Sequence, residues 1–388
     1  MRKKPYIIVG ALVIIIFAAL EISDLVLTPE PPEMDGQLWM SQIPVESELL
    51  VQNWLYGTNQ IAEQFHLGID GSVKQVDENY ILTTGGLVTE ATYEQMMAID
   101  QGMFIDYLQT ETGGVFAFLQ RKPTDSHYFT IYDWSETAGV IFQIDIPKMK
   151  KNPSILTMQK EGDMIYLFDY DNYENPNGIF LIAINEQTGT LQTWELSWRE
   201  IVGEADGRYR LRDMVLNSGN VVVYDGVLYL AESSYPNGDG VRKVLLSAYD
   251  LEREQRIGGD DLGQDPVIAF GHSEQELHVL TNPHDWNTIQ LHSYSAKTMQ
   301  KLGTVTYELP AEWTARVPRE NQNYALSLAD VTADLVFVVL PVQDETENSA
   351  DLVAYLRESG EMVWYGTVQL NETGYEIRKA TFHAVESA

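Results

Sequence analysis

The chain of 388 residues contains no cysteine, which excludes disulfides, thiolate metal sites, thiol nucleophiles and lipid attachment at an N-terminal cysteine. Basic residues are also scarce, because 25 Lys and Arg stand against 57 Asp and Glu, for a net charge of -32. A surface this acidic repels the phosphate backbone of nucleic acids, so nucleic acid is not an expected partner. Cations and basic protein partners suit this charge better.

Several enzyme motifs are missing as well. The sequence has no Gly-rich phosphate loop, no Gly-x-Ser-x-Gly elbow and no His-Glu-x-x-His pair. Carboxylates are so abundant that the sequence singles out no catalytic pair. We therefore expect a non-catalytic binding or scaffolding module for a protein or an envelope component. The alternative is an extracytoplasmic hydrolase or lyase that acts on glycans or peptides through carboxylates in a central channel.

The N-terminus has the features of an export signal. A short basic segment precedes the apolar run Tyr6–Leu20, which places the N-terminus in the cytoplasm and the rest of the chain outside. We expect an uncleaved single-pass anchor over residues 1–27 of a cell membrane; cleavage near Ala18 is the alternative. The Pro- and Glu-rich segment 28–47 predicts an extended stalk, and 48–388 an extracytoplasmic domain.

From about residue 48 onward, short apolar and aromatic runs alternate with turn residues, which is typical of β-strands. The runs recur in units of four, and adjacent units are offset by about 45 to 65 residues, the period of propeller blades. The second strand of the unit gives the strongest signal, at Val115–Leu119, Met164–Phe168, Val227–Ala231, Leu277–Leu280 and Leu335–Leu340. The pattern predicts an all-β chain folded as one β-propeller.

The two ends of the chain are expected to complete each other. The first unit lacks its first strand, whereas Tyr375–Ala384 is a strand without a blade. Pairing the two ends in one blade closes the ring and removes unpaired sheet edges. This gives six blades; seven is the alternative, because Tyr80–Val88 is a further strand. Thr92–Asp100, with apolar residues at helical spacing, predicts a short helix inserted between blades.

One repeat has a recognisable form. Ala183–Trp194 reads AINEQTGTLQTW, which resembles the repeat of quinoprotein-type β-propellers, Ala-x-Asp-x-x-Thr-Gly-x-x-x-Trp, with Asn185 in place of the Asp and four residues instead of three between Gly189 and Trp194. In that repeat the turn joins the third and fourth strands and the Trp packs between neighbouring blades. The group includes quinone-dependent dehydrogenases and cofactor-free scaffolds such as outer-membrane assembly lipoproteins. The dehydrogenases carry vicinal cysteines that this chain lacks, so the resemblance implies a scaffold without a cofactor.

Two sets of residues are candidates for metal binding. Asp169, Asp171 and Asn175 lie in a loop with alternating oxygen donors, which suits Ca²⁺; a solvated hairpin turn is the competing interpretation. A symmetric hairpin around Asn282–Asn287 would place His278 opposite His292 on one face. Two imidazoles in that position could begin a Zn²⁺ or Cu²⁺ site, and a polar cross-strand pair is the competing interpretation.

Aromatic residues are numerous, and their positions divide them into two groups. One group recurs just before the turn that ends the third strand, and we expect it in the core between sheets: Tyr132, Tyr249, Tyr294 and Tyr355. Tryptophans outside that register are candidates for the surface: Trp54, Trp134, Trp286 and Trp313. Loop residues are the candidates for a binding surface, because propellers usually bind through their connections: Tyr173, Tyr235 and Trp286.

Overall fold

The structure of the chain is a computed structural model. It describes residues 33–38, 45–53, 61–68, 72–75, 80–82, 87–99, 103–110, 113–121, 127–135, 139–146, 155–169, 178–203, 220–234, 243–273, 275–283, 287–316, 328–343, 348–369 and 375–384.

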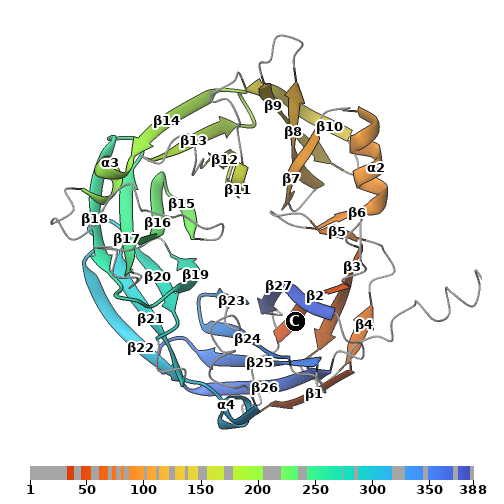
Figure 1. Cartoon of the computed structure of the whole chain (residues 1–388), viewed down its shortest axis with the longest axis vertical. Coiled ribbons are helices and arrows are strands. Elements are labelled where there is room, and N and C mark those ends of the chain that lie inside the picture. The colour runs from red at the N-terminus through yellow and green to blue at the C-terminus, as the bar shows by residue number, and fades with distance from the viewer. Residues whose placement is uncertain are drawn as a thin grey trace, which may run out of the picture.

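Within these residues, six antiparallel sheets stand around a central axis in an arrangement of the β-propeller type (Figure 1). In four of them, four consecutive strands pair in chain order. Apolar runs form the inner strands because both faces of such a strand pack against neighbouring sheets, and β13 is buried along almost its whole length. The strands are β7 (Met103–Thr110), β8 (Gly113–Arg121), β9 (His127–Ser135) and β10 (Gly139–Ile146); β11 (Ile155–Glu161), β12 (Met164–Asp169), β13 (Gly178–Asn185) and β14 (Leu191–Ser197); β15 (Val221–Tyr224), β16 (Val227–Ser234), β17 (Lys243–Asp250) and β18 (Gln255–Asp261); β19 (Val267–His272), β20 (Glu276–Thr281), β21 (Thr288–Ser295) and β22 (Lys301–Glu308).

The other two sheets join the ends of the chain. The C-terminal strand β27 (Tyr375–Ala384) pairs with β2 (Val45–Asn53), so the predicted sharing of one sheet by both ends is confirmed. At the outer edge of the neighbouring sheet, β1 (Glu33–Leu38) pairs with β26 along its whole length. Residues predicted as a stalk thus form a strand here, because a partner edge is available to them. That sheet also contains β23 (Leu328–Val331), β24 (Leu335–Gln343), β25 (Asn348–Leu356) and β26 (Met362–Gln369).

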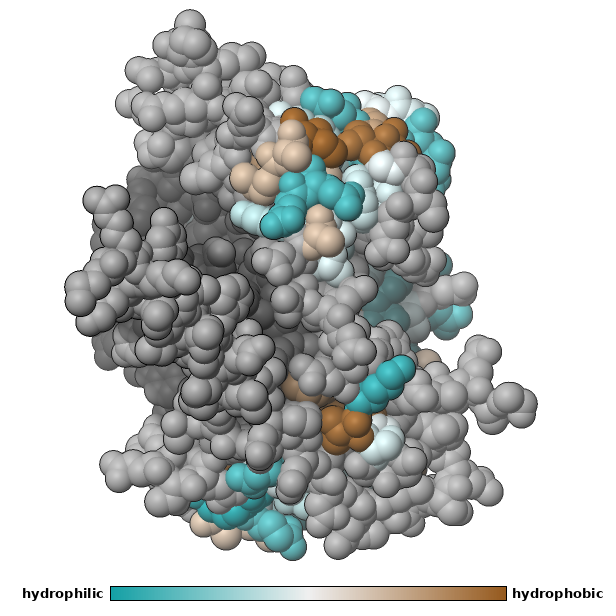
Figure 2. Space-filling model, turned by 90° about the vertical axis from the view of Figure 1, so that its right-hand side faces the viewer, coloured by the Kyte–Doolittle hydropathy of each residue, from teal (hydrophilic) through white to brown (hydrophobic). Residues whose placement is uncertain are grey.

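The additional strand signal near residue 80 does not make a seventh sheet within the described ranges. It forms β5 (Tyr80–Leu82) and β6 (Leu87–Thr89), which extend the sheet of β2, β3 (Ile61–Gly68) and β4 (Val73–Gln75). The predicted inserted helix follows as α2 (Glu90–Ile99). Figure 2 looks onto the side of the ring that carries α2, where apolar side chains lie among polar ones. Ile99 of α2 and Val140 and Ile141 of β10 are exposed large apolar residues.

The core lies in the seams, a seam being the interface between two neighbouring sheets. All four of the recurring tyrosines are buried as predicted. The hydroxyls of two of them also donate hydrogen bonds to the outermost strand of the preceding sheet. Tyr355 donates to the Glu308 carbonyl (2.8 Å), and Tyr294 donates to the Asp260 carboxylate (2.8 Å).

Two short helices each bury a tryptophan over a seam. Trp198 begins α3 (Trp198–Val202), and Trp313 lies in α4 (Ala311–Arg316) with its indole donating to the Pro341 carbonyl (3.3 Å). The surface predictions for Trp313 and Trp134 are therefore wrong, since both are buried. None of the helices in the described ranges has the length and apolar character of a membrane span, and residues 1–27 lie outside those ranges.

Candidate binding face

Ala183–Trp194 forms the end of β13, a tight turn and most of β14. The Asn185 side chain accepts hydrogen bonds from the backbone N–H of Gln187 (3.1 Å) and Thr188 (2.9 Å), and Gly189 follows at φ +67°. Such an Asx turn followed by a left-handed glycine fixes the direction of the next strand. The Trp194 indole then crosses the seam and donates to the Leu251 carbonyl of the next sheet (3.2 Å).

This turn belongs to one end of the ring, which we call the turn face. It carries the turns between first and second strands and between third and fourth strands, such as Gly162–Asp163, Asp225–Gly226 and 251–254. The Gly162–Asp163 turn of the β11–β14 sheet therefore lies at the same end of the ring as the Asp225–Gly226 and 251–254 turns of the β15–β18 sheet. All three turns carry carboxylates. The side chains described below all lie at this end of the seam between these two sheets or next to it.

Near the central axis, side chains of β11 make hydrogen bonds to the backbone of β15 and of the turn that follows it. The Gln159 amide donates to the Val223 carbonyl and accepts from the Val223 N–H, both at 2.7 Å. Two residues further on, the Glu161 carboxylate accepts from the Asp225 N–H at 2.6 Å. Burial raises the pKa of Glu161 above its usual range, although the hydrogen bond from Asp225 opposes the shift. These contacts hold the two innermost strands in register without an intervening strand.

The same rim continues into the next sheet through a histidine. His272 stacks on Tyr224, with ring centroids 4.3 Å apart and an interplanar angle of 7°. Its Nε2 lies 3.4 Å from the Asp225 carboxylate, an approach that becomes an ion pair when the imidazole is protonated. The inner rim of the turn face thus combines carboxylates with an imidazole.

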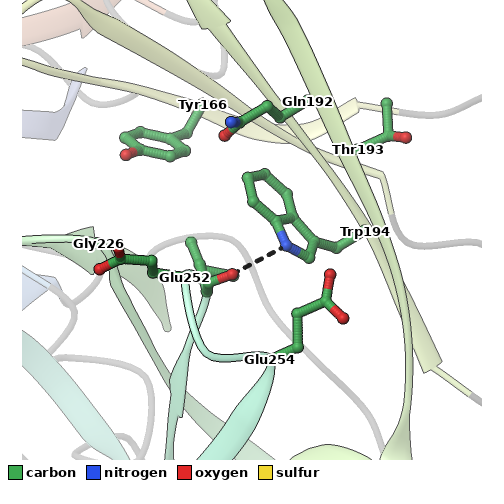
Figure 3. Close-up of a pocket in the computed structure, with 8 residues that line it drawn as sticks. Tyr166, Gln192, Thr193, Trp194, Gly226, Glu252 and Glu254 are labelled. Carbon is green, nitrogen blue, oxygen red and sulfur yellow. Dashed lines mark hydrogen bonds between the residues drawn. The ribbon is translucent and has the colours of Figure 1, made fainter.

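Further out along the same seam lies a pocket of about 440 Å³. Its lining includes the side chains of Tyr166 and Trp194 and two exposed glutamates, Glu252 and Glu254. Figure 3 shows the Glu254 carboxylate beside the Trp194 indole, with the ring of Tyr166 on the other side of the indole. Glu254 has φ +51°, so the turn holds this residue in a left-handed conformation that non-glycine residues seldom adopt.

The electrostatics of the pocket favour a positively charged guest. Burial, with the nearby Glu161 carboxylate, raises the pKa of Tyr166 to about 12, so its hydroxyl stays protonated. That hydroxyl makes no hydrogen bond to the described residues and remains free to interact with a ligand. An indole face and two carboxylates together attract a cation, because both the ring quadrupole and the negative charges act in the same sense.

The predicted pairing of His278 with His292 is wrong by one residue. In the structure His278 lies opposite Ser293 and His292 lies opposite Val279, which places the two imidazoles on opposite faces of the sheet. Arg357 can only donate, so His278 Nε2 accepts from it (3.1 Å), and the Nδ1–H then donates to Ser293 (3.0 Å).

Both imidazoles are engaged with other protein groups. His292 contacts the hydroxyls of Thr281 (3.2 Å) and Thr304 (3.0 Å), so each of its ring nitrogens has a partner. Burial lowers the pKa of His292 to about 4 and also lowers the pKa of His278. Within the described ranges, no group of three or more His, Asp or Glu side chains is placed to hold a metal ion.

The other predicted sites lie outside the described residues. Asp171 and Asn175 of the calcium loop do so entirely, and the side chain of Asp169 does as well, although its backbone ends β12. The predicted surface residues fall in the same class: Tyr173, Tyr235, Trp286 and Trp54. The calcium prediction stays a prediction, and a rise in Tm on adding calcium to the purified chain would support it.

Sequence reasoning did not single out the residues of the seam pocket. Trp194 was expected to pack between sheets, but Tyr166, Glu252 and Glu254 come from a strand and a turn that carry no motif. The available signal was positional. Tyr166 and Tyr229 have equivalent positions, since each is the third residue of the second strand of its sheet, β12 or β16.

No family model matches the chain, and no curated protein matches it by sequence. Among solved structures, an ACO/RPE65 chimera aligns over 92% of this chain and 96% of its own, with 7% identity and a TM-score of 0.49. A hypothetical selenium-binding protein from Sulfolobus tokodaii aligns over 84% and 74%, with 13% identity and a TM-score of 0.40. A prolyl endopeptidase aligns over 88% and 43%, with 10% identity and a TM-score of 0.41. The propeller-type fold described here rests on the strand pairings of the chain itself.

Proposed function

We propose that this chain is a membrane-anchored, extracytoplasmic binding or scaffolding module, which holds a positively charged protein or envelope component on its turn face without catalysing a reaction. The observation that supports this best is the gathering of carboxylates and aromatic rings at one seam of a chain with net charge -32. Such a charge steers basic partners toward the surface, and aromatic side chains supply contact area once they arrive.

The charges at this seam extend over a distance that a peptide could follow. Glu161 and Asp225 stand at the inner rim, and Glu252 and Glu254 stand further out on the same face. A basic segment lying along the seam would meet negative charge at both ends of this line. A partly buried carboxylate is screened less by salt than an exposed one, so Glu161 favours binding at physiological ionic strength more than the exposed Asp225 does.

The chain length between anchor and ring supports a location close to the membrane. If residues 1–27 form the anchor, only residues 28–32 separate it from β1, which begins at Glu33. Six Cα steps of at most about 3.6 Å reach about 20 Å. The sheet of β23–β26 would then be nearest the membrane, and the seam pocket lies across the ring from β1 (Figure 1).

The repeat around Trp194 supports a place among quinoprotein-type propellers, in their cofactor-free scaffold branch. Its Asx turn and the seam-crossing indole are the features that this repeat type implies. Fold alone does not determine function, so the proposal depends on the chemistry of the turn face.

The test measures binding and turnover with the same purified full-length chain. An arginine-rich peptide, its glutamate-rich counterpart and a panel of glycans and unlabelled peptides serve as probes. We expect saturable binding of the arginine-rich peptide alone, weakened by added salt, with every probe recovered intact. Robust turnover that is lost on Glu161→Gln would replace the proposal with a hydrolase or lyase. Equal binding of the acidic and basic peptides would also overturn it.

A further inference from the structure

Three seams of this ring share one contact, and they differ in the strand that supplies its donor. An aromatic side chain of one sheet donates a hydrogen bond to a carbonyl in the third-to-fourth-strand turn of the next. Tyr229 donates to Ala296 (3.1 Å), and Tyr307 donates to Arg357 (2.7 Å). Leu251 has the equivalent turn position in the β15–β18 sheet, since each of the three residues directly follows its third strand.

The strand that supplies the donor differs between seams, because Tyr229 lies on the second strand β16 and Tyr307 lies on the outermost strand β22. The seam between the β11–β14 and β15–β18 sheets has the second form. Trp194 reaches the Leu251 carbonyl from the outermost strand. Tyr166, at the position equivalent to Tyr229, is left without that acceptor, and the space between the two rings is the pocket. A tyrosine that closes the seam in one sheet therefore lines an opening in another.

From this arrangement we infer that the seam pocket is a binding site for the guanidinium group of a partner's arginine side chain, an inference that rests on the proposed binding function. A planar guanidinium can stack on the Trp194 indole while its edge N–H groups reach carboxylates, which an ammonium cannot do in the same way. Glu254 lies beside the indole, and Glu252 belongs to the same turn. The Tyr166 hydroxyl lines the pocket as a further polar group.

The size of the pocket agrees with this guest. A volume of about 440 Å³ admits a long side chain together with ordered water. Trp194 is held in place by its hydrogen bond to Leu251, so little side-chain freedom remains to be lost on binding. The two glutamates are exposed and hydrated, which limits each charge contact to a modest contribution and makes binding dependent on salt.

The experiment uses three short peptides that differ at one central residue: arginine, lysine, or the neutral isostere citrulline. Each is titrated into the purified full-length chain while tryptophan fluorescence is recorded. We expect the arginine peptide to bind about tenfold more tightly than the citrulline peptide and several-fold more tightly than the lysine peptide. Equal binding of arginine and citrulline, or of arginine and lysine, would overturn the assignment.

Three variants locate the site with little effect on the fold. Glu254→Gln removes one pocket charge and is expected to weaken the arginine peptide about three- to fivefold. Tyr166→Phe removes a hydroxyl that bonds to no described residue, and we expect a smaller loss. Glu195→Gln is the matched control, because Glu195 is exposed on β14 next to Trp194 but does not line the pocket. Equal effects of Glu254→Gln and Glu195→Gln would refute the site.

The two proposals fail in different ways. If the chain binds the long arginine-rich peptide and the pocket variants bind it as well as the wild type does, the binding function stands and the pocket assignment falls. If the chain binds neither the long peptide nor the single-arginine peptide, both fall. A thermal unfolding measurement on each variant shows that lost binding does not come from lost folding.

Discussion

A buried carboxylate makes the stability of this chain depend on pH in an unusual direction. Glu232 on β16 is fully buried; one of its oxygens accepts from the Ser247 hydroxyl (3.1 Å), and the other has no hydrogen-bond partner. Burial raises the pKa of Glu232 from 4.5 to about 8, although Ser247 and Arg256 oppose the shift. The folded chain therefore holds a proton that the unfolded chain releases between these two values.

The sign and size of the effect follow from linkage. A folded-state pKa above the unfolded value gives stability that is fully present below pH 4.5 and is lost as the pH rises toward 8. Within that window the loss is about 1.4 kcal/mol per pH unit, and it reaches about 3 kcal/mol at pH 7. Glu232→Gln removes the titration, while the amide keeps an oxygen that can accept from Ser247.

The assay is denaturant unfolding of wild type and Glu232→Gln at several pH values from 5 to 8. Their difference in free energy of unfolding should shift in favour of the variant by about 3 to 4 kcal/mol across this range. The amide leaves N–H groups unpaired, which lowers the variant's stability by a constant amount and does not change this slope. Glu195→Gln, at an exposed position, should run parallel to wild type. Parallel curves for Glu232→Gln would refute the reasoning.

Three further predictions concern the folded state. Gly178→Ala places a Cβ 1.9 Å from a carbonyl oxygen of β14 and should destabilise the chain by about 2 to 4 kcal/mol, whereas Gly303→Ala meets nothing within 4 Å and should change stability little; thermal unfolding compares them. Arg316→Met leaves the buried Asp351 carboxylate without its ion pair, for a loss of about 3 to 5 kcal/mol that Asp351→Asn should partly restore in the double variant, as denaturant unfolding can show. His292 has a folded pKa of about 4, below its unfolded value of 6.5, so stability falls as the pH drops between them, and His292→Asn should flatten that fall in acid unfolding curves.

The fold could be predicted from the sequence where burial is local and periodic. Strands such as Met164–Asp169 are apolar because neighbouring sheets cover both of their faces, and that pattern is visible in a single segment. The pairing of Tyr375–Ala384 with the first sheet could be predicted because an unpaired strand and an incomplete sheet were both visible. The strand Glu33–Leu38 could not, since it follows a Pro-rich segment and its pairing depends on a distant edge.

The candidate site was less predictable, because it depends on register and on contacts between distant segments. A shift of one residue in the register between β20 and β21 puts His278 and His292 on opposite faces, and the strand residues alone do not fix that register. Trp313 stands between Glu312 and Thr314 in a short segment that carries no strand pattern, and its hydrogen-bond partner is the distant Pro341 carbonyl. The sequence shows a tyrosine at position 166, but it does not predict that the hydroxyl of Tyr166 lines a pocket.

The seam pocket is more than a packing defect. The Leu251 carbonyl has a hydrogen-bond donor, but the space beside Tyr166 is left open. At the place of Trp194, the next sheet has Asp260, which accepts from Tyr294 across its own seam. The tryptophan thus brings its own donor to the Leu251 carbonyl and satisfies it, as the tyrosines do elsewhere. It leaves Tyr166 beside carboxylates in an opening that an apolar side chain could have filled. A ring under selection for stability alone would favour closing this seam as it closes the next, so we attribute the opening to a ligand.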